Sequence, residues 1–237
     1  AALNLSGSGG HNSPYGSFAE YTRVNPYYRP TNEFGEYLRQ LDNHTGAGSV
    51  PIANPLFNAN VGIKDLTSST NIAATLNLEC RLLKNLRLTE NLSYQRGMAR
   101  SERFLPAEHT SFLTELDKTL RGSYTKNTGE MTSWSSNLGL NWNMSLRKHL
   151  FSVFGNWTLS EDRSNYVNLS AVGYPDPHMD DFIFGNKMTT NPSGSEAISR
   201  TMGFITQLSY SYDNRYSLDW NISSEVTSRY ADHSLTP

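Results

Sequence analysis

The residues best suited to metal chemistry lie in a short acidic segment, where His178 stands between Asp176 and the pair Asp180 and Asp181. Carboxylate oxygens and an imidazole this close together could bind a divalent cation. The spacing matches no EF-hand loop, however. A segment rich in Asp and Pro is more typical of a solvated turn. We therefore predict a turn here, with no metal and no cofactor.

The sequence contains no motif for nucleophilic or phosphate chemistry. Neither a Gly-x-Ser-x-Gly elbow nor a His-Glu-x-x-His pair occurs in it. The glycine-rich run at residues 7–10 lacks the lysine and the strand-to-helix context of a phosphate loop. A single cysteine, Cys80, excludes an intramolecular disulfide. We therefore predict that the protein is not an enzyme.

A different candidate is an aromatic segment near the start of the chain, which carries Tyr15, Tyr27, Tyr28 and Arg29. Exposed aromatic side chains stack on sugar rings or anchor a protein partner. The alternative is that these side chains pack against each other and fold a large loop onto itself. Both roles stay open at this stage, and we treat the four residues as candidates for contact with a ligand or a capping partner.

The composition limits the kinds of element that can position these residues. The net charge is −2, with 18 % charged and 37 % hydrophobic residues, and Asn and Ser make up much of the balance. An aromatic content of 11 % argues against disorder, and a pI near 6.3 argues against nucleic-acid binding. A mean hydropathy of −0.54 suits a soluble domain. It equally suits a membrane β-barrel, whose apolar face occupies only every second residue.

Period-two alternation is the strongest pattern in the chain. Between positions 72 and 82 the apolar residues are even-numbered and the polar residues mostly odd-numbered, and the pattern resumes after a short turn. Two further segment pairs alternate in the same way, which predicts antiparallel hairpins at about 70–96, 130–160 and 199–226. Glu90 is the exception on the apolar side, and it requires a bulge or an interfacial position.

Three features favour a transmembrane barrel over a soluble β-sandwich. The expected strands are about 10–14 residues long, against about 5–6 in soluble sheets. Their polar side carries Asn, Ser, Thr and Gln with few lysines. Short turns alternate with long connections at about 7–69, 97–128 and 161–199, as in outer-membrane barrels. Within these connections, residues 36–41 and 112–120 fit short helices.

The aromatic spacing agrees with a membrane band. Trp134 and Trp142 share one side of a strand, and their separation spans roughly 20 Å along the membrane normal. The predicted aromatic girdle comprises Tyr94, Trp134, Trp142, Trp157, Tyr212, Tyr216 and Trp220. The opposite side should face a water-filled lumen, with Asn77, Arg81, Asn91, Asn137, Asn141, Gln207 and Asp219 as its main candidates.

Several segments resemble the SusC/RagA family of TonB-dependent outer-membrane transporters. They lie at residues 12–18, 25–30, 54–59, 83–88, 122–125, 193–200 and 210–216, and together they span most of the chain. The resemblance implies that residues 1–237 form an all-β, antiparallel part of a transmembrane barrel of about 22 strands. About seven strands and three extracellular loops would lie in this piece, without the plug domain or the remaining strands.

The same resemblance implies a function. Members of the family sit in the outer membrane of Gram-negative bacteria and import glycan fragments or peptides. The TonB complex energises them, and a SusD-like surface lipoprotein closes over the mouth. Two alternatives stay open: a TonB-dependent receptor for siderophores or cobalamin, and a non-transport surface adhesin or carbohydrate-binding β-protein. None of these readings requires a nucleic-acid partner.

Overall fold

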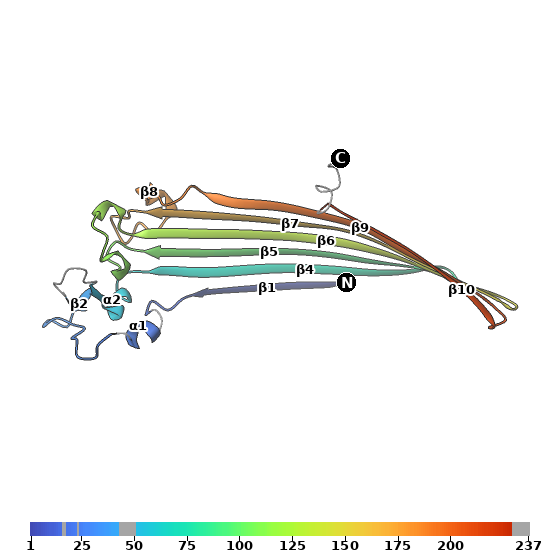
Figure 1. The fold of residues 1–237 in the computed structure, drawn as a ribbon, viewed down its shortest axis with the longest axis horizontal. Helices are drawn as coiled ribbons and strands as arrows, with labels where there is room; N and C mark the ends of the chain where they lie inside the picture. Colours follow the sequence, from blue (N-terminus) through green and yellow to red (C-terminus); the bar gives the residue numbers. More distant parts are fainter. Residues whose placement is uncertain (16–17, 23, 43–50, 229–237) are drawn as a thin grey trace.

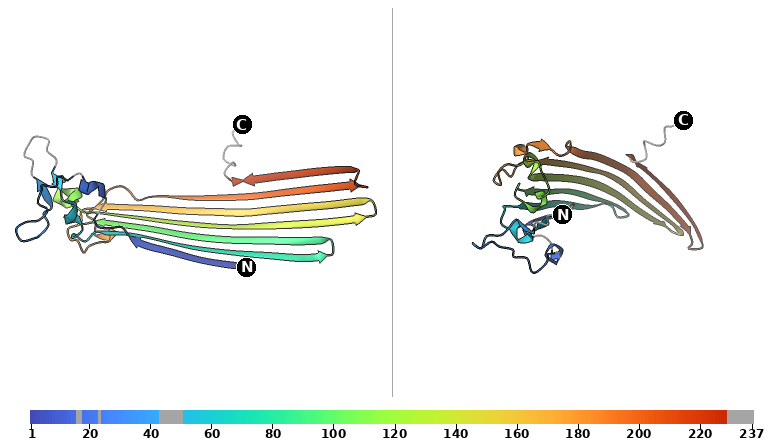
Figure 2. Two further views of the ribbon diagram at one scale, coloured as in Figure 1. Left: turned by 90° about the horizontal axis from the view of Figure 1, so that it is seen from below. Right: turned by 60° about the vertical axis from the view of Figure 1, so that its left-hand side comes forward.

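The computed structural model describes residues 1–15, 18–22, 24–42 and 51–228. Long antiparallel strands form one curved wall in these residues (Figures 1 and 2). Their order across the wall is β1-β4-β5-β6-β7-β9-β10, and the short β8 pairs with the loop end of β7. The bounds are β1 Ala2–His11, β4 Lys64–Leu83, β5 Leu86–Leu105, β6 Ser123–Leu146, β7 His149–Val172, β8 Lys187–Met188, β9 Ser193–Tyr212 and β10 Tyr216–Thr227.

Smaller elements occupy the connections. A second sheet pairs β2 (Gln40–Asp42) with β3 (Ile52–Ala53). The helices are α1 (Phe18–Thr22), α2 (Pro55–Asn58) and the 3-10 turns η1 (Thr110–Phe112), η2 (Lys118–Leu120) and η3 (Phe182–Phe184). None of the helices in the described part of the chain is long and apolar enough to cross a membrane.

Each hairpin runs further toward the loop end than the alternation predicted. The three hairpins span residues 64–105, 123–172 and 193–227. The prediction stopped where apolar residues end, but the backbone ladder continues past residue 96 through charged register partners such as Glu102 and Lys126, whose side chains lie 3.7 Å apart. Ladder hydrogen bonds need no apolar side chain, so the strands extend past the apolar band. The loops are correspondingly shorter than expected.

The two ends of the wall differ, as Figure 1 shows. Tight turns join β4 to β5, β6 to β7 and β9 to β10 at one end, and the long connections gather at the other. Asp213 and Asn214 turn the last hairpin with φ of 52° and 53°, a left-handed conformation that Asp and Asn tolerate better than most residues. We call these the turn end and the loop end.

The expected short helices in the loops are wrong. Residues 112–120 contain only the last residue of the 3-10 turn η1 and the separate 3-10 turn η2. Tyr37 pairs with Thr31 in an isolated bridge, and β2 begins at Gln40. The side-chain oxygen of Asn32 accepts the backbone N–H groups of Phe34 and Glu36, both at 2.9 Å. This local turn competes with a helix for the same backbone donors.

The strand register gives the wall one apolar and one polar face. Leu76 pairs with Leu92, and Leu88 pairs with Leu140. Neighbouring residues of a strand point to opposite sides of the sheet. A continuous register therefore places the apolar side chains of all the strands on the same side. We call the face bearing these leucines the apolar face, and the opposite one the polar face.

Glu90 lies on the apolar face in unbroken register, paired with Leu78 and Leu138. The two explanations expected from the sequence, a bulge and an interfacial position, therefore do not apply. The register has no bulge at Glu90, and Glu90 lies midway along β5 between Leu86, the partner of Trp142, and Tyr94, the partner of Trp134. The Ser136 hydroxyl donates to its carboxylate at 2.6 Å. This bond offsets part of the cost of placing a carboxyl among apolar side chains.

The main buried cluster lies at the loop end, on the apolar face. Phe104, Tyr124 and Ala171 come from three adjacent strands, and Tyr174 covers them from the following loop. The rings of Phe104 and Tyr174 meet edge-on, with centroids 5.2 Å apart. Gly173 starts this loop at φ +85°, where a Cβ would collide with the backbone of Thr119. The connection at 173–192 therefore folds back over the apolar face.

Candidate functional site

The polar face presents a continuous row of amide side chains. Asn77, Asn91 and Asn137 are register partners across β4, β5 and β6. The Thr158 hydroxyl extends the row by donating to the Asn137 side-chain oxygen at 2.9 Å. Amide and hydroxyl side chains are uncharged, and they can both donate and accept hydrogen bonds.

The other lumen candidates share this face. Arg81 pairs with Arg87, which in turn pairs with Asn141 on β6. Gln207 pairs with Asn221, and Asp219 accepts a hydrogen bond from Ser209. The register thus brings all seven predicted lumen residues onto one side of the wall.

A cavity of about 440 Å³ opens at the loop end of the polar face. Asp65 and Arg103 contribute to it from β4 and β5, and His109 from the connection that follows β5. The first long connection supplies the facing side with Tyr15, Glu20, Asn58 and other residues. The first loop therefore leans over the polar face, opposite to the loop that covers the apolar face.

Opposite charges lie side by side in this cavity. Arg103 Nε is 3.6 Å from Asp65 Oδ2, and Asn12 Nδ2 donates to Asp65 Oδ1 at 2.8 Å. Arg39, from the first loop, donates to the carbonyl oxygens of Ala107 and of His109, which lines the cavity. The cavity can accordingly satisfy both donors and acceptors of a polar ligand.

Two buried asparagines hold the first loop in place. Asn54 Nδ2 donates to the carbonyl oxygens of Pro30 and Leu38, and its Oδ1 caps α2 by accepting from Leu56 N. Asn58 exchanges two hydrogen bonds with Thr110, at 2.7 and 3.0 Å. Because these amides are bonded within the protein, we assign them a structural role rather than ligand contact.

His109 is a buried, neutral histidine on the cavity wall. Burial lowers its pKa to about 4, and the charges of Arg103 and Arg39 act in the same direction. Its Nδ1 accepts the backbone N–H of Ser111 at 3.1 Å and so caps η1. Protonation would remove that acceptor and place a third positive charge beside the two arginines.

We expect the segment around η1 to open more easily as the pH falls from about 6.5 to about 4. The folded pKa of His109 is the lower one, so between these values the unfolded segment binds more protons. Stability present above pH 6.5 is then lost, by roughly 3 kcal/mol at most. Hydrogen exchange of the Ser111 amide measures it. In His109→Asn, which keeps an acceptor without titrating, the pH dependence should vanish, and an unchanged slope would contradict the assignment.

The aromatic candidates divide into different environments. Tyr15 lines the cavity, and its carbonyl oxygen accepts the Tyr21 hydroxyl at 2.6 Å. Tyr27 is 92 % exposed, Arg29 is also exposed, and Tyr28 is half-buried. Asp65, Arg103 and His109 did not stand out in the sequence because they lie beyond the apolar alternation.

The carboxylates of the acidic segment at 176–181 bind separate partners within the protein. Asp176 binds the backbone N–H and ring of His178, Asp180 pairs with Lys64 at 3.0 Å, and Asp181 caps η3. No cluster of three metal-ligating side chains occurs among the described residues.

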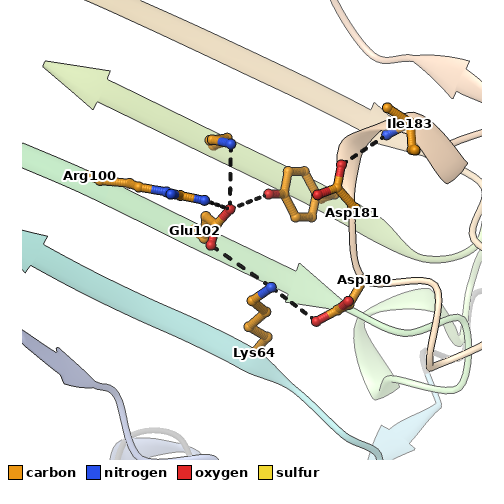
Figure 3. A network of polar contacts seen from close by, with 8 residues as sticks. Lys64, Arg100, Glu102, Asp180, Asp181 and Ile183 are labelled. Carbon is orange, nitrogen blue, oxygen red and sulfur yellow. Dashed lines mark hydrogen bonds and ion pairs between the residues drawn. The ribbon is translucent and has the colours of Figure 1, made fainter.

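Glu102 links this segment to the wall (Figure 3). Its carboxylate accepts hydrogen bonds from the Tyr124 hydroxyl and from Arg100, both at 2.6 Å, and Lys64 lies between Glu102 and Asp180. Burial alone would raise the carboxyl pKa, but these hydrogen bonds and the cations lower it to about 2. The network therefore stays charged over the usual pH range and ties the loop at 173–192 to β4, β5 and β6.

The aromatic residues form two levels on the apolar face. Tyr94 and Trp134 are register partners toward the loop end. Toward the turn end, Trp142 shares a register row with Trp220, through Val153 and Leu208. Tyr212 pairs with Tyr216 four residues further toward the turns.

Trp157 departs from the predicted girdle. It pairs with Leu138, the residue opposite Glu90, and so lies in the middle row rather than at either aromatic level. Its indole lies over Gly155, where a Cβ would come within 2.9 Å of the ring. The missing side chain at Gly155 gives this ring room to lie flat on the sheet.

No family model and no curated protein matches this chain. Solved structures do. The RagAB peptide transporter matches with a TM-score of 0.61, 16 % identity, and coverage of 96 % of this chain and 26 % of the other. The RagAB peptide importer in its open-open state matches with a TM-score of 0.60, 16 % identity, and coverage of 96 % of this chain and 25 % of the other. In its closed-closed state it matches with a TM-score of 0.62, 15 % identity, and coverage of 96 % and 26 %.

These similarities confirm the predicted fold, an antiparallel segment of a β-barrel wall that is not closed by itself, and with it the structural resemblance to RagA-type proteins. The matched proteins are described as a peptide transporter and a peptide importer. This chain spans about a quarter of the length of the chains it matches.

Proposed function

We propose that this chain forms part of the wall of an outer-membrane transporter that imports glycan fragments or peptides. In this proposal the TonB complex energises transport, and a SusD-like surface lipoprotein caps the loop end. The likeness to the RagAB peptide transporter over 96 % of the chain supports the transporter. The sorting of the wall into apolar and polar faces is the observation that carries the proposal.

The apolar face suits lipid. Between the two aromatic levels it carries leucines, Phe204 and Trp157, together with Glu90, whose carboxylate is bonded to Ser136. These residues lie where a bilayer interior would be. Aromatic rings at both edges suit the headgroup levels. The membrane orientation then follows, with the turn end inside the cell envelope and the loop end outside.

The polar face suits passage of an uncharged or mixed-charge ligand. Peptides and glycans both present many donors and acceptors, and the amides and hydroxyls of this face can exchange hydrogen bonds with either. The cavity adds Asp65, Arg103 and Tyr15 at the mouth. The step is binding and gated movement, with no covalent bond made or broken.

We expect Tyr15→Ala combined with Tyr27→Ala to reduce both lipoprotein association and uptake of the peptide or oligosaccharide, by about tenfold if the rings act as anchors. The variants belong in the full-length protein, and pull-down of the lipoprotein and uptake of labelled substrate are measured. Tyr216→Ala is the control, because that ring is exposed at the opposite end. Unchanged association and uptake would refute the role of the mouth tyrosines.

Uptake assays also separate the alternatives. A siderophore or cobalamin receptor would take up the iron chelate or the corrinoid and ignore oligosaccharides and peptides. A surface adhesin would bind its target without any uptake that depends on TonB.

A further inference from the structure

Three ion pairs lie on the apolar face at its loop-end edge. Arg96 binds Glu130, Arg163 binds Glu196 and Arg200 binds Glu161, with closest approaches of 2.5 to 2.6 Å. The strand register places all six side chains on the face that carries the leucines. We call Arg96, Arg163 and Arg200 the arginine belt.

The belt lies at the depth of the upper aromatic level. Trp134 pairs with Glu161, and Glu161 pairs with Arg200, so Arg200 occupies the same register row as Trp134. Arg96 and Arg163 both pair with Thr132, two residues further toward the loop end. In a bilayer this is the level of the headgroups, where amphipathic rings and cations gather.

The guanidinium groups keep donors for a second acceptor. Arg200 binds Glu161 through Nε, and Arg96 and Arg163 each use Nε and Nη2 on a single carboxylate oxygen. An arginine carries five N–H donors, so others on each side chain stay available. The side chain of Arg200 is 69 % exposed. The carboxylates fix the guanidinium planes, which suits bidentate binding of phosphate.

An apolar groove lies directly beside Arg200. It has a volume of about 420 Å³ and runs over β7, β9 and β10. Leu159, Met202, Val226 and Trp134 line it, and Glu161 and Arg200 border it. The combination of an apolar groove with an arginine at its rim matches an acyl chain attached to a phosphorylated headgroup.

We propose that the arginine belt and this groove bind a phosphorylated glycolipid of the outer leaflet, with its phosphate on the arginines and an acyl chain along the groove. The inference rests on the proposed membrane orientation of the wall. Exposed ion pairs by themselves stabilise a fold only slightly. Lipid binding would give these three pairs a role beyond stability. The site lies on the face opposite to the transport path.

The test uses the full-length protein in detergent, titrated with bis-phosphorylated lipid A and followed by native mass spectrometry. We expect Arg200→Gln and Arg163→Gln each to weaken lipid A binding by about tenfold, the loss typical of a hydrogen bond between charged groups. Dephosphorylated lipid A should bind the unaltered protein about as weakly as bis-phosphorylated lipid A binds these variants. Arg87→Gln is the matched control, since Arg87 lies on the polar face near the turn end.

Three outcomes would overturn the proposal: equal lipid A affinity in the belt variants and the unaltered protein, equal affinity for the dephosphorylated lipid, or full competition by inorganic phosphate. The last would show a free-anion site rather than a lipid site. Failure of the proposed function is distinguishable, because a protein that is not a membrane transporter would neither insert into phosphatidylcholine vesicles nor support uptake. Failure of the lipid site alone leaves insertion and uptake intact.

Discussion

Leu140→Arg should sharply reduce the folded, membrane-inserted fraction of the full-length protein. Leu140 lies on the apolar face between Leu88 and Gly155, one row from the centre of the apolar band. An arginine facing lipid near the bilayer midplane costs about 2–4 kcal/mol, which corresponds to roughly 30- to 1,000-fold in the folding equilibrium. Urea titration of the protein in vesicles, read by the mobility shift of the folded barrel, measures the loss.

Asn141→Arg is the control, because Asn141 is the next residue of the same strand and lies on the polar face between Arg87 and Phe154. Its new cation would meet water, so assembly should change little. Equal losses in the two variants would contradict the assignment of the faces. A loss of folded protein confined to Asn141→Arg would show that the polar face, and not the apolar face, meets lipid.

Phe104→Ala should release the loop at 173–192 from the wall. The Phe104 side chain is fully buried among Tyr124, Ala171 and Tyr174, and removing a buried phenyl ring typically costs about 3–5 kcal/mol. The cost falls on the docking of the loop, since strand pairing through Phe104 uses backbone groups alone. Hydrogen exchange of the Tyr174 amide, which donates to the Arg121 carbonyl oxygen at 2.8 Å, reports the release.

Phe154→Ala supplies the comparison for this variant. Phe154 belongs to β7 but is 36 % exposed on the polar face, so truncating it leaves no enclosed cavity. Its effect on exchange at Tyr174 should be negligible. If Phe104→Ala left that exchange as slow as in the unaltered protein, the network around Glu102 would be sufficient to hold the loop without the aromatic cluster.

Alternation predicted the wall well for a specific physical reason. Every second residue of a strand points to the same face, and the register carries this alternation from one strand to the next. The pattern therefore places Asn77 and Asn137 on the same face although they are far apart in sequence. The same rule failed where polar and charged residues occupy both faces. It could not distinguish a strand that continues through Glu102 and Lys126 from a loop, and it gave no depth for Trp157.

The cavity was beyond reach from the sequence because distant segments form it. Tyr15, Asn58, Asp65 and His109 come from the first loop, a strand and the second connection. Each is ordinary in its local sequence. Only the leaning of the first loop over the polar face, held by Asn54 and Asn58, brings them together.

The length of β6 has an electrostatic consequence. Eleven residues separate Trp134 from Ser123 at the loop end, which is roughly 36 Å along the strand and roughly 28 Å along the normal at a tilt near 40°. That height is about three and a half Debye lengths at physiological salt. The charge of the lipid surface is therefore screened at the mouth. Salt dependence of ligand capture would report the charges at the mouth itself, Asp65 and Arg103 among them, and not those of the membrane below.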